Sequence, residues 1–419
     1  MSFDFDESVA NRAVKKFLEV YEKLPNSGKP NYDEYTVLSG ILLFDRSTGY
    51  TEVISIGTGT KCISGAKLSP LGNILNDSHA EIIARRGLLV YLYDAMKRTA
   101  EGEMTVLKMV NGKFELPSDY ELHFYTSQLP CGDATILPTV KLAPDEECLP
   151  LESNKRKADD DISDIDKKKE LRVIPDVFRT GAKCLPHCEQ DTKEPGDTYH
   201  LLGQVRTKPG RGERTLSVSC TDKIAKWMHL GLQGSLMGLL FNKPIYLKSI
   251  IIGGGVPFSQ ECLKRALVLR NPNFTIENIP TFEQSSVVFP HKKSETRYKA
   301  GPTSIIWVNL DNGYPEVACF GIRRGTTKKH INYEKMFLSI CKYVLYQRFV
   351  EVLLLLDKDN VIPGTESVLT IPYNKMKRKN KQYYEKWEIV KEEFFKAWTK
   401  KPDMWDFCAD SKLIRVKPC

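Results

Sequence analysis

A histidine, a glutamate and two distant cysteines stand in patterns that suit a catalytic metal site. His79 and Glu81 lie two residues apart in NDSHAE (76–81), at the start of a predicted helix. Cys131 follows a predicted strand in LPCGDA, and Cys220 lies in SVSCTDK. One histidine nitrogen and two cysteine sulfurs are a ligand set that binds zinc and leaves a fourth position open for water. The pattern therefore predicts a zinc site at His79, Cys131 and Cys220.

Glu81 is the residue of this pattern that suits proton transfer. Zinc lowers the pKa of a bound water from about 15.7 to about 7, so that hydroxide forms at neutral pH. An unligated glutamate beside that water takes its proton and passes it to the ring nitrogen and the leaving ammonia of a purine. Taken singly, a cysteine after proline or a His-x-Glu pair is more often structural than catalytic. Their combination favours hydrolytic deamination with Glu81 as the catalytic residue.

The spacing after Cys131 departs from the general signature of zinc deaminases, H-x-E followed by P-C-x-x-C. Ala134 stands where the second cysteine of that signature belongs, and alanine cannot bind a metal. Either zinc is lost or the third ligand lies elsewhere. Cys220, 89 residues after Cys131, is the cysteine that we expect to complete the site.

Five segments together resemble the core blocks of one family, the adenosine deaminases acting on RNA and their tRNA-acting relatives. These segments are GTGTKCISG (57–65), NDSHAEIIARR (76–86), PCGDA (130–134), SCTDKIAKW (219–227) and LQGSL (232–236). The resemblance covers roughly residues 35–400 apart from a charged insertion. GAKC (181–184) and KPGRGERT (208–215) look most like the tRNA-acting branch. The resemblance implies a zinc deaminase that forms inosine in tRNA, at position 37 beside the anticodon of tRNA-Ala.

Two basic residues stand on the apolar side of predicted helices, where an unpaired buried charge is costly. Arg86 lies between Ile82 and Leu89, and Lys342 lies in a similar place in a second helix. Either these side chains reach outward to solvent, or a buried anion meets them. The residues alone favour the first interpretation.

The family resemblance favours the buried anion, because members of the family enclose inositol hexakisphosphate inside the fold. The positions that match its contacts are Arg85, Arg86, Lys223, Lys226, Lys342, Tyr373, Lys377, Lys391 and Lys401. Near Lys391 and Lys401 the spacing departs from that of the editing enzymes by a few residues. Asp77 and Lys208 stand where they would link this anion to the zinc site.

The loop KPGRGERT is basic and glycine-rich, which favours contact with phosphates, with a simple surface turn as the alternative. By resemblance, Glu213 in this loop occupies the space left by a flipped base, while Thr60 and Lys61 contact sugar and phosphate. An adenosine in an anticodon loop is already unpaired, so its extrusion is easier than from a duplex. About 35 residues precede the deaminase blocks, too few for a double-stranded-RNA-binding domain, which favours tRNA as the partner.

The elements that position these residues alternate between strands and helices. Strand-like runs at 36–44 and 51–56 precede a helix predicted at 79–98. A strand at 121–127 leads directly into Cys131. Such alternation indicates the α/β class, and we predict a zinc deaminase core with a mixed sheet flanked by helices.

The C-terminal part is predicted to be rich in α-helix. From Ser217 the pattern is strand, helix and strand, and further helices are predicted at 333–356 and around 385–400. Residues 1–419 are expected to form a single deaminase domain. A densely charged insertion at about 145–197 interrupts it, and its low apolar content predicts a disordered segment or a surface insertion.

The composition is typical of a soluble globular protein that leans toward polyanionic partners. Hydrophobic residues make up 41% and charged residues 27% of the 419, and the net charge is +8. No apolar run reaches the about 18–20 residues of a membrane span, and the N-terminus does not resemble a signal peptide. We therefore expect the eleven cysteines to be thiols or metal ligands in a reducing compartment, the nucleus or the cytoplasm. Nothing in the sequence indicates an obligate protein partner.

Other functions remain open on sequence grounds. A double-stranded RNA adenosine deaminase shares the motifs, and a non-catalytic zinc-containing RNA-binding protein shares the fold, although Glu81 with three ligands argues against the latter. A free-nucleoside deaminase is disfavoured by the basic loop and the missing C-x-x-C. CLPHC (184–188) offers three potential ligands for a second metal, but they are too close together to bind one tetrahedral ion easily.

Overall fold

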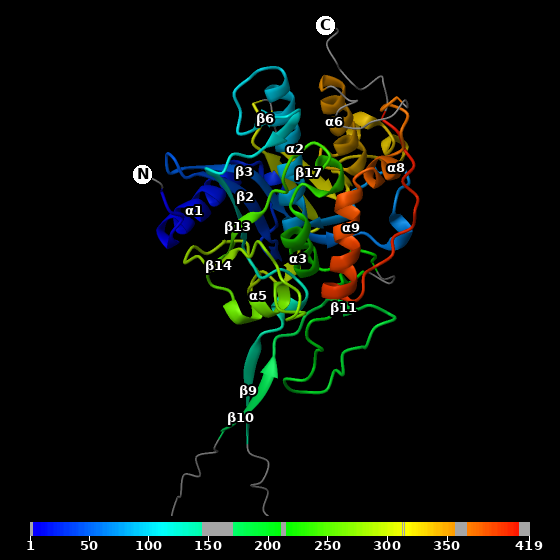
Figure 1. Ribbon diagram of the computed structural model, residues 1–419. Helices are drawn as coiled ribbons and strands as arrows, with labels where there is room; N and C mark the ends of the chain where they lie inside the picture. The colour runs from blue at the N-terminus through cyan, green and yellow to red at the C-terminus, as the bar shows by residue number, and fades with distance from the viewer. Residues whose placement is uncertain are drawn as a thin grey trace, which may run out of the picture.

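An eight-stranded β-sheet forms the centre of the molecule (Figure 1), in the order β14-β13-β8-β2-β3-β16-β17-β18. The structure is a computed structural model, and it describes residues 3–144, 171–210, 215–311, 313, 315–356 and 367–409. β13 runs parallel to β8 and β14, while the other neighbours are antiparallel, so the sheet is mixed, as predicted. The strands are β2 Leu38–Asp45, β3 Tyr50–Thr58, β8 Tyr120–Thr126, β13 Leu247–Ile252, β14 Thr281–Gln284, β16 Thr303–Val308, β17 Glu316–Cys319 and β18 Ile322–Arg323.

Each face of this sheet has its own hydrophobic cluster, because successive side chains along a strand point to opposite faces. Helix α1 (Glu7–Lys23) covers one face, where Phe17 stacks on Tyr125 with their ring centroids 5.3 Å apart. Helix α2 (Ala80–Ala100) covers the other face, and Phe124 belongs to that larger cluster. The sheet therefore holds the N-terminus of α2, where His79 and Glu81 lie, against its centre.

The remaining helices contribute to the cluster on the α2 side, and α6, α8 and α9 group together in the C-terminal part (Figure 1). Their bounds are α3 Cys220–Leu230, α4 Gly234–Met237, α5 Gln260–Leu267, α6 Lys342–Leu355, α8 Tyr373–Arg378 and α9 Lys381–Ile389. Helices flank the sheet and are frequent in the C-terminal part, so the predicted fold class is confirmed.

The long helix predicted over 333–356 is wrong in its first part, because α6 begins only at Lys342. Glu316 accepts hydrogen bonds from the backbone N–H of Ser339 at 2.9 Å and from its hydroxyl at 2.5 Å, which holds this residue outside the helix. Cys341 then caps the helix with its thiol. Lys342 is therefore the first residue of a helix and does not interrupt an apolar stripe in its interior.

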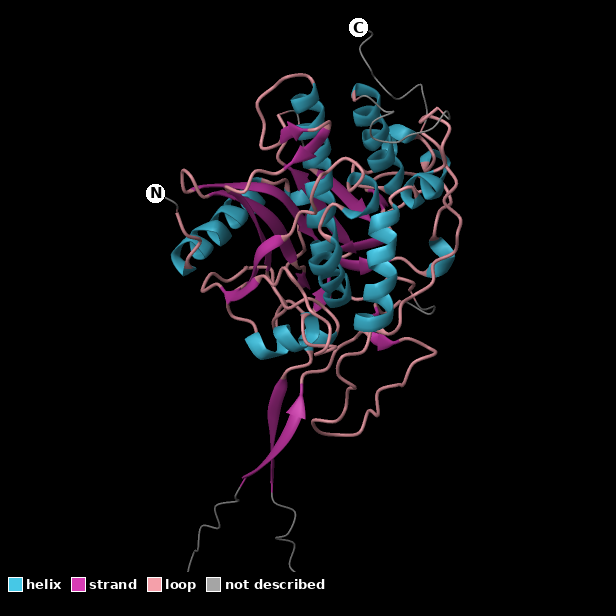
Figure 2. Ribbon diagram, in the orientation of Figure 1, coloured by secondary structure: helices cyan, strands magenta, loops and turns pink. Residues whose placement is uncertain are grey.

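The charged insertion predicted at about 145–197 is ordered where the structure describes it. β10 (Leu171–Val177) pairs antiparallel with β9 (Pro138–Pro144), and the two strands form a ribbon that projects from the body (Figure 2). Further along, β11 (Lys183–Cys184) pairs with β12 (Arg206–Thr207). The prediction of disorder is wrong for residues 171–197, because strand pairing and buried polar contacts fix them. Residues 145–170 lie outside the described residues.

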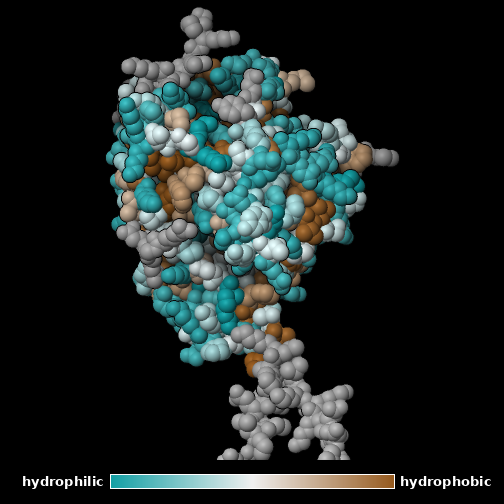
Figure 3. Space-filling model, turned by 180° about the vertical axis from the view of Figure 1, so that it is seen from behind, coloured by the Kyte–Doolittle hydropathy of each residue, from teal (hydrophilic) through white to brown (hydrophobic). Residues whose placement is uncertain are grey.

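Three short strand pairs complete the described structure. They are β1 Glu34–Tyr35 with β15 Lys299–Ala300, β4 Thr60–Cys62 with β5 Asp77–His79, and β6 Lys108–Val110 with β7 Lys113–Glu115. The rear face of the molecule is mostly hydrophilic, and its hydrophobic side chains lie in separate patches (Figure 3). In the part of the chain that the structure describes, no helix combines the length and the hydropathy that crossing a membrane requires.

Candidate metal centre and adjoining cationic cavity

Three different elements bring the predicted zinc ligands together. His79 ends β5 and occupies the capping position before α2. Cys131 lies in the loop after β8, and Cys220 is the first residue of α3. The strand predicted before Cys220 is reduced to one bridge between Val218 and Thr207, so the third ligand is presented by a helix N-terminus.

The distances between these ligand atoms fit a tetrahedral zinc ion. His79 Nδ1 lies 3.8 Å from Cys131 Sγ and 3.6 Å from Cys220 Sγ. Zinc bonds of 2.3 Å to sulfur and 2.0–2.1 Å to nitrogen, at tetrahedral angles, separate the two ligand atoms by about 3.6 Å. Among the described residues, these three form the one group of histidine, cysteine and acidic side chains with metal-ligand spacing.

Glu81 is buried beside the three ligands without a hydrogen-bond partner for one carboxylate oxygen. The residue is 3% exposed, and its Oε2 contacts no donor. Burial raises the pKa of this carboxyl above its ordinary value, and the Cys131 sulfur acts in the same direction. A buried carboxyl group without a partner is costly for the fold, which is typical of a group kept for catalysis.

Asp77 and Lys208 connect the metal ligands to the interior behind them. The ammonium group of Lys208 donates to Asp77 Oδ2 at 2.7 Å and to Cys220 Sγ at 3.1 Å. Asp77 also accepts from the backbone N–H of His79 at 3.0 Å and pairs with Lys223. Asp77 therefore orients one ligand directly and a second through Lys208, as neighbours of a metal ligand commonly do.

Gly132 allows the loop that carries Cys131 to approach the start of α3. Its φ is +111°, a backbone conformation that residues other than glycine rarely adopt. A Cβ atom here would lie 2.3 Å from Ser219 Oγ. The backbone N–H of Thr221 donates to the carbonyl of Cys131 at 3.1 Å, which joins the two cysteine-bearing segments.

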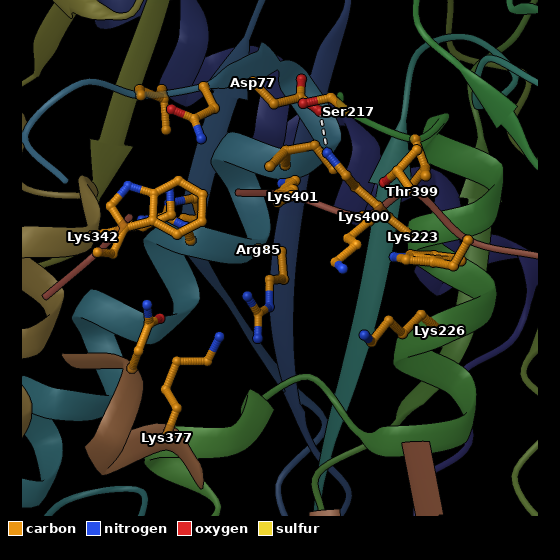
Figure 4. A pocket seen from close by; sticks show the side chains of 18 of the residues that line it. Asp77, Arg85, Ser217, Lys223, Lys226, Lys342, Lys377, Thr399, Lys400 and Lys401 are labelled. Carbon is orange, nitrogen blue, oxygen red and sulfur yellow. Dashed lines mark hydrogen bonds and ion pairs between the residues drawn. The ribbon is translucent and has the colours of Figure 1, made fainter. Parts of the chain in front are cut away.

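A cavity of about 580 Å³ lies next to this centre and is lined by an excess of positive charge. Side chains from α2, α3, α6, α8 and the C-terminal segment point into it (Figure 4). The cations on its wall are Arg85, Arg86, Lys223, Lys226, Lys342, Lys377, Arg378, Lys400 and Lys401. Only Asp77 and Asp403 oppose them among the residues that line the cavity, and each already pairs with one of the cations.

Several of these cations are held without any carboxylate partner. Lys342 is fixed over the Trp405 ring, 4.1 Å from its centroid, and Lys226 lies 3.1 Å from that of Trp387. Burial and neighbouring cations lower the pKa of both lysines well below the ordinary value, and they lower that of Lys401 to about 8. The cavity therefore disfavours the charged state of these three lysines unless an anion enters it.

Seven of the nine residues predicted to contact the inositol phosphate lie on the wall of this cavity. Tyr373 lines an adjoining cavity of about 310 Å³ that shares Arg85, Arg86 and Lys342 with the first. Arg86 therefore faces a cavity, which differs from the solvent-reaching conformation that the residues alone favoured. The sequence analysis missed Lys400, which also points into the cavity (Figure 4).

The structure does not bring Lys391 to either cavity. The helix predicted around 385–400 ends at Ile389 and continues as a π-helical turn, Val390–Phe395, whose Phe394 side chain is buried in the core. Lys391 is turned outward and pairs with Glu388. The lining of neither cavity supports the predicted contact of Lys391 with the inositol phosphate.

The three residues predicted to contact RNA have different outcomes. Thr60 pairs with His79 across β4 and β5, and its hydroxyl is buried without a hydrogen-bond partner. Lys61 is the next residue of β4, opposite Ser78. Glu213 lies outside the described residues. Thr60 is thus beside the metal ligand His79.

The cysteine cluster CLPHC does not form a second metal group among the described residues. Cys184 is buried, and its thiol donates to Asp191 over 3.5 Å. The nine cysteines in the described part of the chain form no disulfide.

Comparison with known proteins identifies close relatives of the whole arrangement. A sequence profile of the adenosine-deaminase (editase) domain matches residues 55–402. The tRNA-specific adenosine deaminase 1 of Drosophila melanogaster is 34% identical, with 96% of this chain and 96% of that protein covered. The protein of the same name from Homo sapiens is 30% identical, with 91% and 95% covered. The double-stranded RNA-specific editase Adar of Drosophila melanogaster is 32% identical, with 59% of this chain and 33% of that protein covered.

Proposed function

Because this chain belongs to the adenosine-deaminase (editase) family, we propose that it hydrolyses the 6-amino group of an adenosine in tRNA, which gives inosine and ammonia. The target that we propose is position 37, beside the anticodon of tRNA-Ala. The observation that carries this proposal is the cluster of His79, Cys131 and Cys220 with the buried Glu81 beside it, whose Oε2 has no hydrogen-bond partner. A tRNA substrate is favoured over duplex RNA because the tRNA-acting relatives are similar over nearly the whole chain.

We propose zinc as the metal, since its preferred ligand types and bond lengths match the three side chains. Zinc in this site would lower the pKa of a water molecule toward about 7. Glu81 Oε2, buried without a hydrogen-bond partner, would accept a proton from the attacking water and return it to the purine ring. Burial raises the pKa of the Glu81 carboxyl above its ordinary value, which is the direction that suits a group that must both accept and return a proton.

The substrate adenosine must leave its stack to reach a buried glutamate. An unpaired anticodon-loop base is extruded with less unstacking than a paired one. Thr60, with a buried hydroxyl that lacks a partner, is suited to bind the ribose of the extruded nucleotide. We keep Lys61 as a phosphate contact and Glu213 as the residue that fills the vacated space, both on the resemblance alone.

Purified protein with zinc is expected to form inosine in tRNA and to leave perfect duplex RNA nearly untouched. Transcripts of tRNA-Ala and a long duplex with many adenosines would be incubated in parallel, and inosine would be read by sequencing. A tRNA-Ala transcript with guanosine at position 37 is the matched control and should gain no inosine. Comparable turnover on the duplex would support the double-stranded RNA alternative, and zinc-loaded protein without activity on either RNA would support a non-catalytic RNA-binding protein.

We propose that inositol hexakisphosphate occupies the cationic cavity as a structural cofactor. Nine cations around about 580 Å³ face only two carboxylates among the lining residues, and such an excess of positive charge is strongly unfavourable in a low-dielectric interior. A polyphosphate supplies both the negative charge and the many acceptor oxygens that lysine and arginine donors require. Arg85, Lys226 and Lys342 would hold it, with Lys377 and Lys401. We retain Tyr373 as a contact in the adjoining cavity.

Denaturing extraction of the purified protein is expected to release an inositol polyphosphate, measurable by mass spectrometry and phosphate analysis. The ligand binds the folded state alone, so it stabilises that state by mass action. Lys342→Ala should therefore lower the soluble yield and the melting temperature, whereas Lys381→Ala, at an exposed position of α9, should change neither. Active protein from which no inositol phosphate can be extracted would refute the cofactor.

We also propose the nucleus or the cytoplasm as the location of the protein. The cysteines of the described part are unpaired with one another, as expected in a reducing compartment. Fluorescence microscopy of the tagged full chain tests this, and a signal confined to the secretory pathway would contradict it.

A further inference from the structure

The carboxylate of Asp191 is the centre of a buried polar cluster in the insertion between Cys131 and Cys220. Arg206 donates to it from both terminal nitrogens, at 2.7 Å and 2.6 Å. The backbone N–H of Leu201 donates at 3.0 Å, and His200 Nδ1 lies 3.0 Å away. Burial alone would raise the pKa of Asp191, but the hydrogen bonds from Arg206 and His200 outweigh it and lower the pKa. Both oxygens are therefore occupied by donors, and the carboxylate is held in one position.

Arg206 connects Asp191 to the segment that carries Cys220 through backbone hydrogen bonds. Its side chain is fully buried, and it is a residue of β12. Its backbone N–H donates to Asp222 at 3.0 Å, and its carbonyl accepts from the N–H of Ser219 at 2.7 Å. Ser219 is the capping residue of α3, immediately before Cys220. One residue thus joins the insertion to the helix start that presents the third metal ligand.

Two residues beyond Arg206, the same strand segment places Lys208 at the metal centre. The N–H of Lys208 donates to the carbonyl of Ser217 at 2.9 Å, which fixes the alignment of the two segments. The ammonium group of Lys208 then reaches Asp77 and Cys220. If Arg206 moved, the backbone that orients Lys208 would move with it, because two peptide units separate the two residues.

We infer that Asp191 is a positioning residue for the deamination reaction, and that it acts through Arg206 to align Lys208 and Cys220. The expected effect on kcat rests on the proposed function. The expected effect on the metal ligands does not depend on the RNA substrate. Asp191 contacts no metal ligand itself. The charged insertion therefore supplies a residue that helps to position the metal ligands.

A second buried carboxylate in the same insertion provides a matched control. Asp176 is 3% exposed and pairs with Arg179 at 2.5 Å, near the base of the projecting ribbon. Its Oδ1 accepts from the backbone N–H of Val177 and from the Arg179 guanidinium. Asp176→Asn therefore removes a buried charge of the same insertion at a residue outside the Asp191–Arg206 pair.

Asp191→Asn is expected to lower kcat on tRNA about tenfold, with KM within about twofold of the wild type, as for groups that support a metal ligand. Full-length, zinc-loaded protein would be used, and rates would be divided by the zinc content. Release of zinc to a colorimetric chelator should become several-fold faster in Asp191→Asn. Asp191→Glu, which keeps the charge, should recover part of both effects. Asp176→Asn should leave kcat and zinc release close to the wild type.

Three results would overturn the inference. The first is an Asp191→Asn protein with wild-type kcat and wild-type zinc release. The second is an equal loss in Asp176→Asn, which would mean that the insertion is merely destabilised. The third is a loss of activity fully explained by a smaller zinc-loaded fraction. A wild type that is inactive on tRNA would refute the proposed function instead, and the zinc-release comparison would still decide the role of Asp191.

Discussion

Glu81→Gln is expected to lower the rate of inosine formation by about 10³-fold or more while the fold and the zinc content stay intact. Glutamine has nearly the same shape as glutamate but cannot accept and return a proton, and positioned acid–base groups contribute about 10²–10⁴-fold. Glu81 is buried, and its Oε2 has no donor that the substitution would disrupt. Single-turnover rates on tRNA, a melting curve and elemental analysis measure the three quantities.

Glu283→Gln is the matched control for this substitution. Glu283 lies on the edge strand β14, away from the cluster, and its Oε2 is also buried without a hydrogen-bond partner. This variant should keep the wild-type rate. If Glu81→Gln retained substantial activity with normal zinc, Glu81 would lose its assigned role in proton transfer.

The catalytic cluster was largely predictable because its residues are close to element boundaries with local sequence signals. His79 and Glu81 stand at a helix start, and Cys131 follows a strand rich in aromatic and apolar residues. Cys220 was harder to assign, because 89 residues separate it from Cys131 and no spacing rule connects them. The family resemblance and the absence of a ligand at Ala134 pointed to it, and the 3.6 Å distance to His79 supports the assignment.

The errors in the sequence analysis arose where tertiary contacts outweigh local pattern. The apolar residues near Leu338 predicted a helix. Glu316, on a strand distant in sequence, accepts hydrogen bonds from Ser339, and the helix begins only at Lys342. The composition of residues 171–197 predicted disorder, whereas Asp191 and its donors order part of that segment. Hydrophobicity does not reveal a polar core, because charged residues with internal partners look the same in the sequence as charged residues in solvent.

The residues of the cationic cavity were also predictable only in part. Arg86 and Lys342 are basic residues at apolar positions of predicted helices, and both line the cavity. Lys400 comes from an irregular C-terminal segment for which no periodicity predicts a direction, so only the structure reveals it. Lys391 lies in a π-helical turn, which the helical periodicity of the sequence does not predict.

Cys220→Ala is expected to remove zinc from a protein that otherwise carries one equivalent per chain, and to abolish deamination. The substitution leaves one histidine and one cysteine as ligands, and a catalytic zinc site needs three protein ligands and an open position. The alanine keeps the helix N-terminus, because Ser219 and not Cys220 caps α3. Elemental analysis of the purified protein measures the loss of zinc, and a melting curve checks that the variant is folded.

Cys262→Ala is the control, since Cys262 is a buried cysteine near the N-terminus of another helix, α5, and does not belong to the cluster. It should keep both zinc and activity. Cys184 distinguishes the remaining alternative, because it is the buried cysteine of the CLPHC segment. If Cys220→Ala kept full zinc while Cys184→Ala lost it, the third ligand would lie in the insertion. The contact of Cys184 with Asp191 argues against that outcome, since the thiol already donates to a carboxylate whose other donors are fixed.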